Sequence, residues 1–587
     1  MNKMRKLARS VREYKKYAFL SPILMMGEVV MEVLIPMITA SIIDRGIEMG
    51  DMKHVALMGA LLVLASFVSL FFGVMAGRSA SIAGAGFAKN LRQDLFYRIQ
   101  DFSFANIDRF STSSLVTRLT TDVTNVQNAF QMLIRMAFRA PIMLVFAVIM
   151  AVRINGRLSM VFLIALPILG LGLFLIMSRA HPVFTRVFKT YDRLNGVVRE
   201  NVRGIRVVKN YVREDYENRK FKSVSEDIFR DFSKAEKIVA FNGPLMNLCV
   251  YGCMILVSWF GAHLIVQSGN GALNPDGMTV GQLNSMFTYV NMILGSLMML
   301  SFMIIMFTIS RASVDRISEV LNEETTMADP DNPVTEMKDG SIRFDHVSFS
   351  YSGNKDRLAL TDICLDIPSG ATVGILGGTG SSKSTLVQLI PRLYDVTDGT
   401  LTVGGVDVKQ YGMEFLREQV SMVLQKNELF AGTVKDNLRW GNENATDEEI
   451  VAAVKAACAD ECVQKMPDGY DTWIEHGGAN VSGGQKQRLC IARALLKKPK
   501  ILILDDSTSA VDTRTDAMIR SAFRTEIPDT TKLIIAQRVA SVEDADMVVL
   551  LEAGRVVACD TPQNLMKNSA IYREIAESQK KGATENV

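Results

Sequence analysis

Two consecutive carboxylates, Asp505 and Asp506, end the apolar run Ile-Leu-Ile-Leu at residues 501–504. A buried strand that ends in an aspartate is the pattern of a Walker B element, whose carboxylate binds the Mg²⁺ of a nucleotide. In a hydrolysing site the next residue is a glutamate that orients the attacking water. Asp506 is shorter by one methylene, about 1.5 Å of reach, and a displacement of about 1 Å costs on the order of 100-fold in rate. We therefore predict a site that holds ATP better than it hydrolyses it, with Asp506 in the catalytic position.

A glycine-rich loop follows the predicted strand at residues 371–376 and nearly matches the Walker A pattern G-x-x-x-x-G-K-[ST]. In that pattern backbone amides at a helix N-terminus cradle phosphates. Lys383 is expected to reach the β and γ oxygens, and Ser384 to bind Mg²⁺. Ser382 stands where the pattern has glycine, and its Cβ is expected to crowd the loop or its ligand. The predicted nucleotide-binding residues of this loop are Gly377, Gly378, Thr379, Gly380, Ser381, Ser382, Lys383, Ser384 and Thr385.

Other polar residues follow in an order that strengthens this interpretation. Tyr351 offers a ring that stacks on adenine, and Gln425 ends a predicted strand within reach of Mg²⁺ and the attacking water. Val-Ser-Gly-Gly-Gln lies at 481–485, and Ser-Ala-Val-Asp at 509–512. Gln537 follows a further strand; its amide donates a hydrogen bond to a γ-phosphate but does not titrate as an imidazole does.

With these motifs in this order, the chain resembles the ATP-binding-cassette transporters over essentially its whole length. It looks most like one half of the bacterial heterodimeric exporters, which fuse six membrane spans to one nucleotide-binding domain. The resemblance implies an adenine-stacking loop at Tyr351, a Q-loop at Gln425, a D-loop at Ser509–Asp512 that brings Asp512 to the nucleotide, and a switch-histidine position at Gln537. It also implies a signature motif that binds the γ-phosphate of ATP held by the opposite subunit. The signature residues are Ser482, Gly483, Gly484 and Gln485.

Three departures from the family pattern, Ser382, Asp506 and Gln537, all fall on the Walker side, whereas the signature is intact. In the family each composite site joins one subunit's Walker elements to the other's signature, so a homodimer would have two impaired sites. We therefore expect a related half-transporter as partner, supplying the missing glutamate, histidine and complete P-loop, with ATP and Mg²⁺ as cofactors. A slow homodimer stays open as the alternative, and so does a mainly regulatory ATP-binding subunit.

The resemblance further implies ATP-driven export of amphipathic small molecules, drug-like or lipid-like, across the cytoplasmic membrane. A lipid or peptide exporter is the alternative for the cargo. The charge balance of 65 Lys+Arg against 62 Asp+Glu gives no case for a nucleic acid partner. The seven cysteines show neither metal-ligand spacing nor a disulfide framework, as fits a reducing cytosol.

The first half of the chain contains apolar stretches long enough to span a bilayer of about 30 Å. Lys and Arg are abundant in the two long segments between stretches and sparse in the short turns. The positive-inside rule therefore places both termini and the nucleotide-binding domain in the cytosol. The chain is expected to be a multi-pass protein whose spans contact membrane lipids. The long segments are similar to the family's intracellular loops, with coupling helices expected near 112–117 and 211–216. The expected spans are 17–43, 56–80, 131–153, 157–180, 239–267 and 281–310.

Glu28 and Glu32 lie in the middle of the first span and share one helix face. Each would cost a few kcal/mol against lipid, so both are expected to face the bundle interior or a water-filled cavity. One interpretation is a polar patch on the substrate pathway that favours cationic cargo. The other is interhelical hydrogen bonding, with Arg135 or Arg139 as the partner.

The predicted fold is a membrane all-α domain with six spans and long cytoplasmic helical extensions, fused to an α/β P-loop nucleotide-binding domain. The expected limits are 1–315 for the transmembrane domain, 316–340 for a proline-marked linker, 341–580 for the nucleotide-binding domain and 581–587 for a C-terminal tail.

Overall fold

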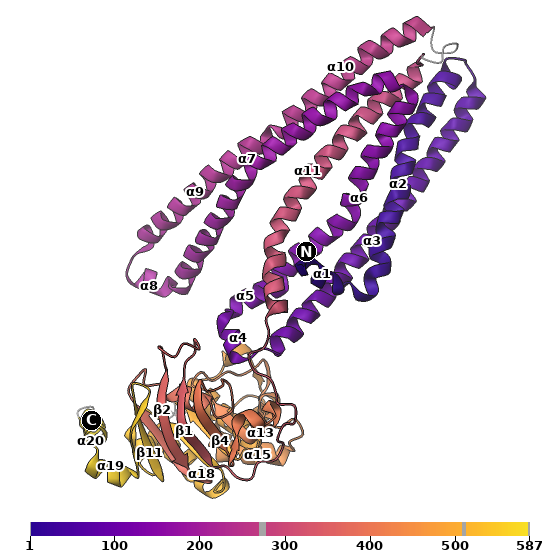
Figure 1. Ribbon diagram of the computed structural model, residues 1–587. Helices are drawn as coiled ribbons and strands as arrows, with labels where there is room; N and C mark the ends of the chain where they lie inside the picture. The colour runs from indigo at the N-terminus through magenta and orange to yellow at the C-terminus, as the bar shows by residue number, and fades with distance from the viewer. Residues whose placement is uncertain (1, 269–276, 507–511, 585–587) are drawn as a thin grey trace. The chain divides into compact units, whose positions relative to one another are not determined.

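The computed structural model describes residues 2–268, 277–506 and 512–584. The chain divides into two compact units (Figure 1). The first consists of Met1–Gln100 and Thr112–Glu323, and the second of Asp101–Ser111 and Glu324–Val587. The short segment Asp101–Ser111 therefore belongs with the C-terminal half of the chain, although it lies in the N-terminal half of the sequence.

The first unit is entirely helical in its described residues. Six segments are long and apolar enough to cross a membrane: Arg12–Ile47, Met52–Gln100, Thr112–Ile154, Gly156–Arg203, Glu214–Gln267 and Val280–Met303. The six predicted spans are confirmed, each lying inside or largely inside one of these segments. The helices are α1 (Asn2–Arg9), α2 (Lys15–Ser41), α3 (Met52–Gln100), α5 (Thr112–Thr117), α6 (Val123–Ile154), α7 (Gly156–Arg203), α8 (Ile205–Asn210), α9 (Glu214–Ala240), α10 (Asn242–Ser268) and α11 (Val280–Asn322).

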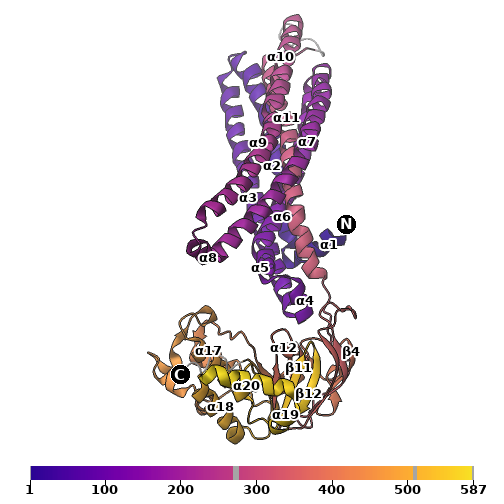
Figure 2. The same cartoon turned by 90° about the vertical axis from the view of Figure 1, so that its left-hand side faces the viewer.

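Several of these helices are much longer than a bilayer is thick. The 49 residues of α3 span about 73 Å at 1.5 Å per residue, against a hydrocarbon core of about 30 Å. α7 and α9 form a hairpin closed by α8, and its α8 end extends away from α3 and α6 (Figure 2). At that tip Tyr211 and Val212 are 71% and 80% exposed. The coupling helix is expected at residues 211–216, which here form the turn between α8 and α9 and the start of α9.

The core of the helical unit lies where α2, α6, α7, α10 and α11 meet. Tyr289 of α11 is fully buried there, and its hydroxyl donates to the carbonyl of Val33 in α2 at 2.8 Å. Phe162 and Ile293 are buried in the same cluster. α2 packs against both α3 and α6, so the face of α2 that carries Glu28 and Glu32 is enclosed by these helices.

The second unit is an α/β domain built on two main sheets. The order of the larger sheet is β12-β11-β3-β10-β9-β6, and that of the smaller is β2-β1-β4-β5. Its strands are β1 (Ile342–Phe349), β2 (Leu360–Ile367), β3 (Thr372–Gly377), β4 (Asp398–Val403), β5 (Val406–Asp407), β6 (Val420–Val423), β7 (Gly432–Thr433), β8 (Trp473–Ile474), β9 (Ile501–Asp505), β10 (Thr531–Ile535), β11 (Met547–Glu552) and β12 (Arg555–Asp560).

Helices cover this domain, and its fold confirms the predicted α/β class. They are α4 (Phe104–Arg109), α12 (Lys383–Gln388), α13 (Met413–Gln419), α14 (Val434–Arg439), α15 (Asp447–Ala456), α16 (Asp460–Gln464), α17 (Gly483–Leu496), α18 (Thr513–Glu526), α19 (Pro562–Asn568) and α20 (Ala570–Thr584).

The central strands β3, β10, β9 and β6 are parallel to one another. Every residue of β9 and β10 is buried, as expected of strands covered on both faces. Because parallel strands end at the same edge of the sheet, the residues that follow them gather there, and ligands of open α/β sheets bind at that edge.

The N-terminal segment that packs in this domain contains α4, not α5. Ser103 and Asn106 form a capping box at the start of α4. The hydroxyl of Tyr394 donates to Asp108 Oδ2 at 2.6 Å, and the rings of Phe104 and Tyr394 lie 6.1 Å apart. Residues 112–117, where a coupling helix is expected, form α5 and belong to the first unit, whereas α4 packs in the second. The coupling role of residues 112–117 stays a prediction.

Candidate nucleotide-binding site

A cavity of about 560 Å³ lies at the carboxyl ends of the parallel strands. The loop after β3 lines it together with Gln425, which follows β6, and Asp506, which follows β9. Gln537, after β10, completes the wall. The structure therefore brings together the Walker A loop, both carboxylates, the Q-loop glutamine and the glutamine at the switch position.

The backbone of the loop explains its glycine pattern. Gly377 has φ 156°, and a Cβ there would collide with the carbonyl of Leu551. Gly380 has φ 82°, and Ser382 has φ 71°, in the left-handed region. Such a conformation costs a non-glycine residue about 1–2 kcal/mol. Ser382 therefore carries backbone strain at the position where the pattern has glycine, immediately before α12 begins at Lys383.

Lys383 and Ser384 point into the cavity region from the first turn of α12. Lys383 Nζ donates to the carbonyls of Gly377 and Gly378, both at 2.8 Å. Ser384 Oγ donates to Asp505 Oδ1 at 2.9 Å. A serine hydroxyl beside a carboxylate is a pair of oxygen ligands suited to Mg²⁺. These two side chains would hold the metal ion, while Lys383 is free to exchange its carbonyl partners for phosphate oxygens.

Burial shifts the protonation of two of these groups. It lowers the pKa of Lys383, an effect that the charges of Asp506 and Asp505 oppose. It raises the pKa of Asp505; the hydrogen bond from Ser384 opposes this rise, and the charge of Asp506 adds to it. A desolvated carboxylate next to a second carboxylate gains most when a cation binds, which suits Asp505 for a metal ligand.

Asp506 is held by the two glutamines. Gln537 Nε2 donates to Asp506 Oδ2 at 2.8 Å, and Gln425 Nε2 donates to the same oxygen at 3.5 Å. Asp506 itself has φ 51°. One oxygen of the carboxylate at the catalytic position is thus already an acceptor for side-chain amides, and neither amide exchanges a proton near neutral pH.

Gln579 in the last helix, α20, also lines the cavity, and it is absent from the site residues expected from the sequence. Its Nε2 donates to the carbonyl of Gln537 at 2.8 Å, and its Oε1 accepts from the amide of Val539 at 2.8 Å. Gln579 therefore fixes the backbone on which Gln537 stands. No motif marks it, because its role arises only when α20 packs beside the end of β10.

Tyr351 lies next to the Walker A helix. Its ring is half-exposed, and its hydroxyl is 3.0 Å from Thr385 Oγ1. The ring lies edge-on to Tyr394 at 5.2 Å and to Phe349 at 4.8 Å. Burial raises the pKa of its hydroxyl. These edge contacts fix the ring beside the P-loop, where a stacking adenine is expected.

The structure does not bring the signature residues to this cavity. Ser482 is the N-cap of α17: its hydroxyl accepts from the amide of Gln485 at 3.3 Å, and its own amide donates to Gln485 Oε1 at 2.9 Å. Gly483 and Gly484 form the first turn of this helix. Ser482 and Gly483 are exposed, so the amino end of α17 is open to a ligand held elsewhere.

Asp512 also caps a helix. Its carboxylate accepts from the amide and the hydroxyl of Thr515, at 2.9 and 2.7 Å, at the start of α18. These hydrogen bonds keep its pKa below the usual value. The rest of the expected D-loop, Ser509, Ala510 and Val511, lies outside the described residues.

In the helical unit, Glu28 and Glu32 pair with Arg139 of α6. Arg139 Nη1 donates to Glu28 Oε1 at 2.6 Å, and Nη2 donates to Glu32 Oε1 and Oε2 at 2.7 and 2.8 Å. Of the two arginines considered from the sequence, Arg139 makes the contact, so interhelical pairing is present in this structure.

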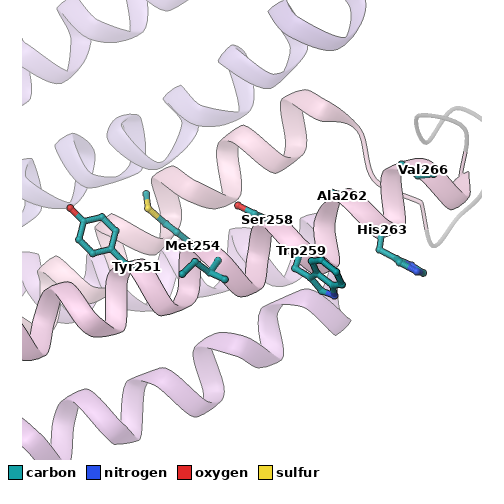
Figure 3. Close-up of a pocket in the computed structure, with 8 residues that line it drawn as sticks. Tyr251, Met254, Ser258, Trp259, Ala262, His263 and Val266 are labelled. Atoms are coloured by element: carbon teal, nitrogen blue, oxygen red, sulfur yellow. The ribbon is translucent and has the colours of Figure 1, made fainter.

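A wide apolar surface runs along the outer side of α10. Tyr251, Met254, Ser258 and Trp259 follow one another at helical spacing on it (Figure 3). Trp259 is 72% exposed and Tyr251 62%. In a bilayer such a stripe faces acyl chains or an apolar helix of another subunit.

Comparison with known proteins agrees with this architecture. Residues 18–313 match the family described as ABC transporter transmembrane region, and residues 360–509 match the one described as ABC transporter. The uncharacterized ABC transporter ATP-binding protein YfiB of Bacillus subtilis is 37% identical, over 98% of each chain. The probable multidrug resistance ABC transporter ATP-binding/permease protein YheI of the same species is 33% identical, over 84% of this chain and 83% of the relative.

A solved bacterial Atm1-family ABC exporter with ATP bound has the same fold. It superposes with a TM-score of 0.78 over 97% of this chain and 98% of that one, at 23% identity. The chain therefore belongs to the ABC transporter family, as an exporter half that fuses a membrane-spanning region to an ATPase domain. It is a multi-pass membrane protein and an ATP-driven transporter of a kind that works as a dimer.

Proposed function

We propose that this chain is one subunit of a heterodimeric exporter of amphipathic small molecules, with a slow ATP site on its own Walker side. The observation that carries the proposal is the environment of Asp506, whose Oδ2 accepts from Gln537 and Gln425. A short carboxylate clamped by amides is poorly placed to orient water, while Lys383, Ser384 and Asp505 keep the features needed to bind ATP and Mg²⁺.

The signature end of the chain supports a partner that hydrolyses ATP. The exposed amino end of α17, a helix of 14 residues, is the positive end of the helix dipole and favours an anion such as a γ-phosphate. Since Ser482 and Gly483 do not line the chain's own cavity, they would complete a site on the partner. That partner would supply the glutamate, the histidine and the full P-loop that this chain lacks.

The helical unit supports the rest of the proposal. The exposed Tyr211 and Val212 at the hairpin tip would dock on the partner's nucleotide-binding domain. Both termini and the nucleotide-binding domain would be cytosolic, in the cell membrane. We keep the domain limits 1–315, 316–340, 341–580 and 581–587 as part of this proposal. The cargo class rests on the apolar spans and on the similarity to YheI, a probable multidrug resistance ABC transporter.

The test is ATPase activity of the chain in lipid, alone and then co-purified with a candidate partner half-transporter. We expect turnover only with the partner, and loss of most of it when Ser482→Ala is introduced in this chain. Because Ser482 also caps a helix, its loss costs about 1 kcal/mol of helix stability. Thr446→Ala is the matched control: Thr446 forms the same kind of capping box with Glu449 on α15 and lies outside the cavity.

Exporter-like turnover by the chain alone would refute the heterodimer and favour the homodimer. Equal losses in Ser482→Ala and Thr446→Ala would show that the signature serine acts only through stability. Nucleotide binding without turnover, with or without the partner, would point to a regulatory subunit.

A further inference from the structure

A line of charged side chains crosses the middle of the helical unit where α2, α3 and α6 meet. α3 presents glycine at two positions one turn apart on the side that faces these charges. We call this line the polar seam; it consists of Glu28 and Glu32 on α2, Arg135 and Arg139 on α6, and Gly73 and Gly77 on α3.

The glycines let the charged groups approach α3. A Cβ at Gly73 would lie 3.1 Å from Glu28 Cδ and 3.2 Å from both of its carboxylate oxygens. A Cβ at Gly77 would lie 3.9 Å from the guanidinium carbon of Arg135. Glu28 and Arg135 thus lie beside successive turns of α3, whose glycines are about 6 Å apart along the helix axis.

Among the described residues, two groups of the seam have no hydrogen-bond partner: one carboxylate oxygen of Glu28 and the guanidinium of Arg135. Arg139 donates to Glu28 Oε1 and to both oxygens of Glu32. Glu28 Oε2 is buried and accepts no hydrogen bond. Among the described residues, Arg135 makes no hydrogen bond or ion pair. The seam is neutral in sum, with a free anionic oxygen at Glu28 and a free guanidinium at Arg135.

Charges in a membrane span are costly, and they are generally kept where they serve a ligand or an ion path. The seam is not sealed: the side chains of Glu28, Glu32 and Arg139 keep 13%, 26% and 23% of their surface exposed. A small polar group can therefore lie against the exposed part of these side chains, within reach of the charge of the Glu28 carboxylate, and the apolar surfaces of the surrounding helices are available to a hydrocarbon tail.

We propose that the polar seam binds the headgroup of a zwitterionic amphipathic molecule, with its cationic group at Glu28 and its anionic group at Arg135. Arg139 and Glu32 hold each other and orient Glu28, so they act as positioning residues. This inference names the cargo class of the exporter proposed above and rests on that function for its role in transport. Binding itself does not depend on ATP or on a partner.

The test measures binding to the full-length chain in nanodiscs of phosphatidylglycerol, an anionic lipid, without ATP. The probes share a dodecyl tail and differ in the headgroup: phosphocholine, trimethylammonium, phosphate and maltoside. Empty nanodiscs correct for partition into lipid. Because this membrane contains no zwitterionic lipid, the bilayer does not supply the proposed ligand.

Glu28→Gln keeps an oxygen for Arg139 and removes the negative charge. We expect it to weaken the phosphocholine and trimethylammonium probes about ten-fold and not to weaken the phosphate and maltoside probes. Arg135→Gln should weaken the phosphocholine and phosphate probes about ten-fold and not weaken the other two. The quaternary ammonium has no N–H to donate, so its loss at Glu28 is that of a charge pair. The phosphate loses a hydrogen bond to a charged group at Arg135, and either loss is worth about ten-fold. Glu226→Gln and Arg230→Gln, exposed on α9, are the matched controls.

The pattern of losses decides the outcome. Equal loss of all four probes would show a structural role, and an effect of only one variant would show a site for a single charge; either result overturns the proposal. Added phosphatidylcholine that competes with the phosphocholine probe identifies a membrane lipid as the ligand, and its failure to compete identifies a single-chain amphipath. Selective binding without ATP-driven transport would refute the exporter role and leave the headgroup site standing.

Discussion

Introducing the family's glutamate and histidine in this chain is expected to speed up the ATP site that we propose to be slow. Asp506→Glu lengthens the side chain by about 1.5 Å, and Gln537→His replaces an amide that now donates to Asp506 Oδ2 at 2.8 Å. The imidazole can carry positive charge near neutral pH, which the amide cannot. Since a displacement of about 1 Å costs on the order of 100-fold in rate, the double variant should hydrolyse ATP faster than the parent by roughly that factor.

The rate has to be measured at this site alone. In the proposed heterodimer, Ser482→Ala in the same chain would disable the partner's composite site, so the ATP hydrolysis that remained would come from the Walker side of this chain. Single-turnover hydrolysis in that background is the assay. Asp506→Asn is the control, since it keeps the length of the aspartate and removes its charge.

The reasoning about reach would be refuted if Asp506→Glu with Gln537→His were no faster than the parent. It would also fail if Asp506→Asn hydrolysed as fast as the parent, because Asp506 would then contribute nothing. Transport measured in parallel separates two roles of the site. A rise in transport together with ATPase activity means that slow chemistry limits the cycle. A fall in transport while ATPase activity rises means that stable ATP occupancy is the function.

Two further variants test the apo structure. Ser382→Gly relieves the φ 71° strain and should stabilise the nucleotide-binding domain by about 1 kcal/mol, seen as a higher melting temperature without nucleotide; a lower melting temperature would contradict the strain. Asp505→Asn should raise the apo melting temperature at pH 7 by a few degrees and abolish stabilisation by Mg²⁺·ATP. Because burial raises the pKa of Asp505, its contribution to stability is greatest at low pH and is lost as the pH rises through that pKa. The rise in melting temperature caused by Asp505→Asn should therefore shrink as the pH falls. A rise that grew towards low pH would contradict a raised pKa of Asp505.

Much of the fold follows from local sequence signals. The apolar stretches predicted six spans because a bilayer sets their length, and the strand before Asp505 could be recognised from its unbroken apolar run. The residues after the parallel strands could be expected to meet because those strands end at one edge. The α/β class and the membership in the exporter family were predicted from the same motifs.

Other features depend on packing between segments distant in sequence. The choice of Arg139 over Arg135 as the partner of Glu28 depends on how α6 lies against α2. The role of Gln579 needs α20 placed beside the end of β10. The capping functions of Ser482 and Asp512 coexist with their expected motif roles, and a motif does not reveal which hydrogen bonds its side chains make within the chain. The strain at Ser382 likewise becomes visible only as a backbone angle.

The position of α4 in the second unit has a consequence for synthesis on the ribosome. Asp108 and the Tyr394 hydroxyl that donates to it are 286 residues apart in the sequence. At about 5–20 residues per second, about 15–60 s pass between synthesis of the segment Asp101–Ser111 and synthesis of Tyr394, against which it packs. A fragment that starts at Glu324 would never receive it, and the ring of Tyr394 would lack its contact with Phe104. The nucleotide-binding domain is thus complete only with the segment Asp101–Ser111, which is translated long before the rest of the domain.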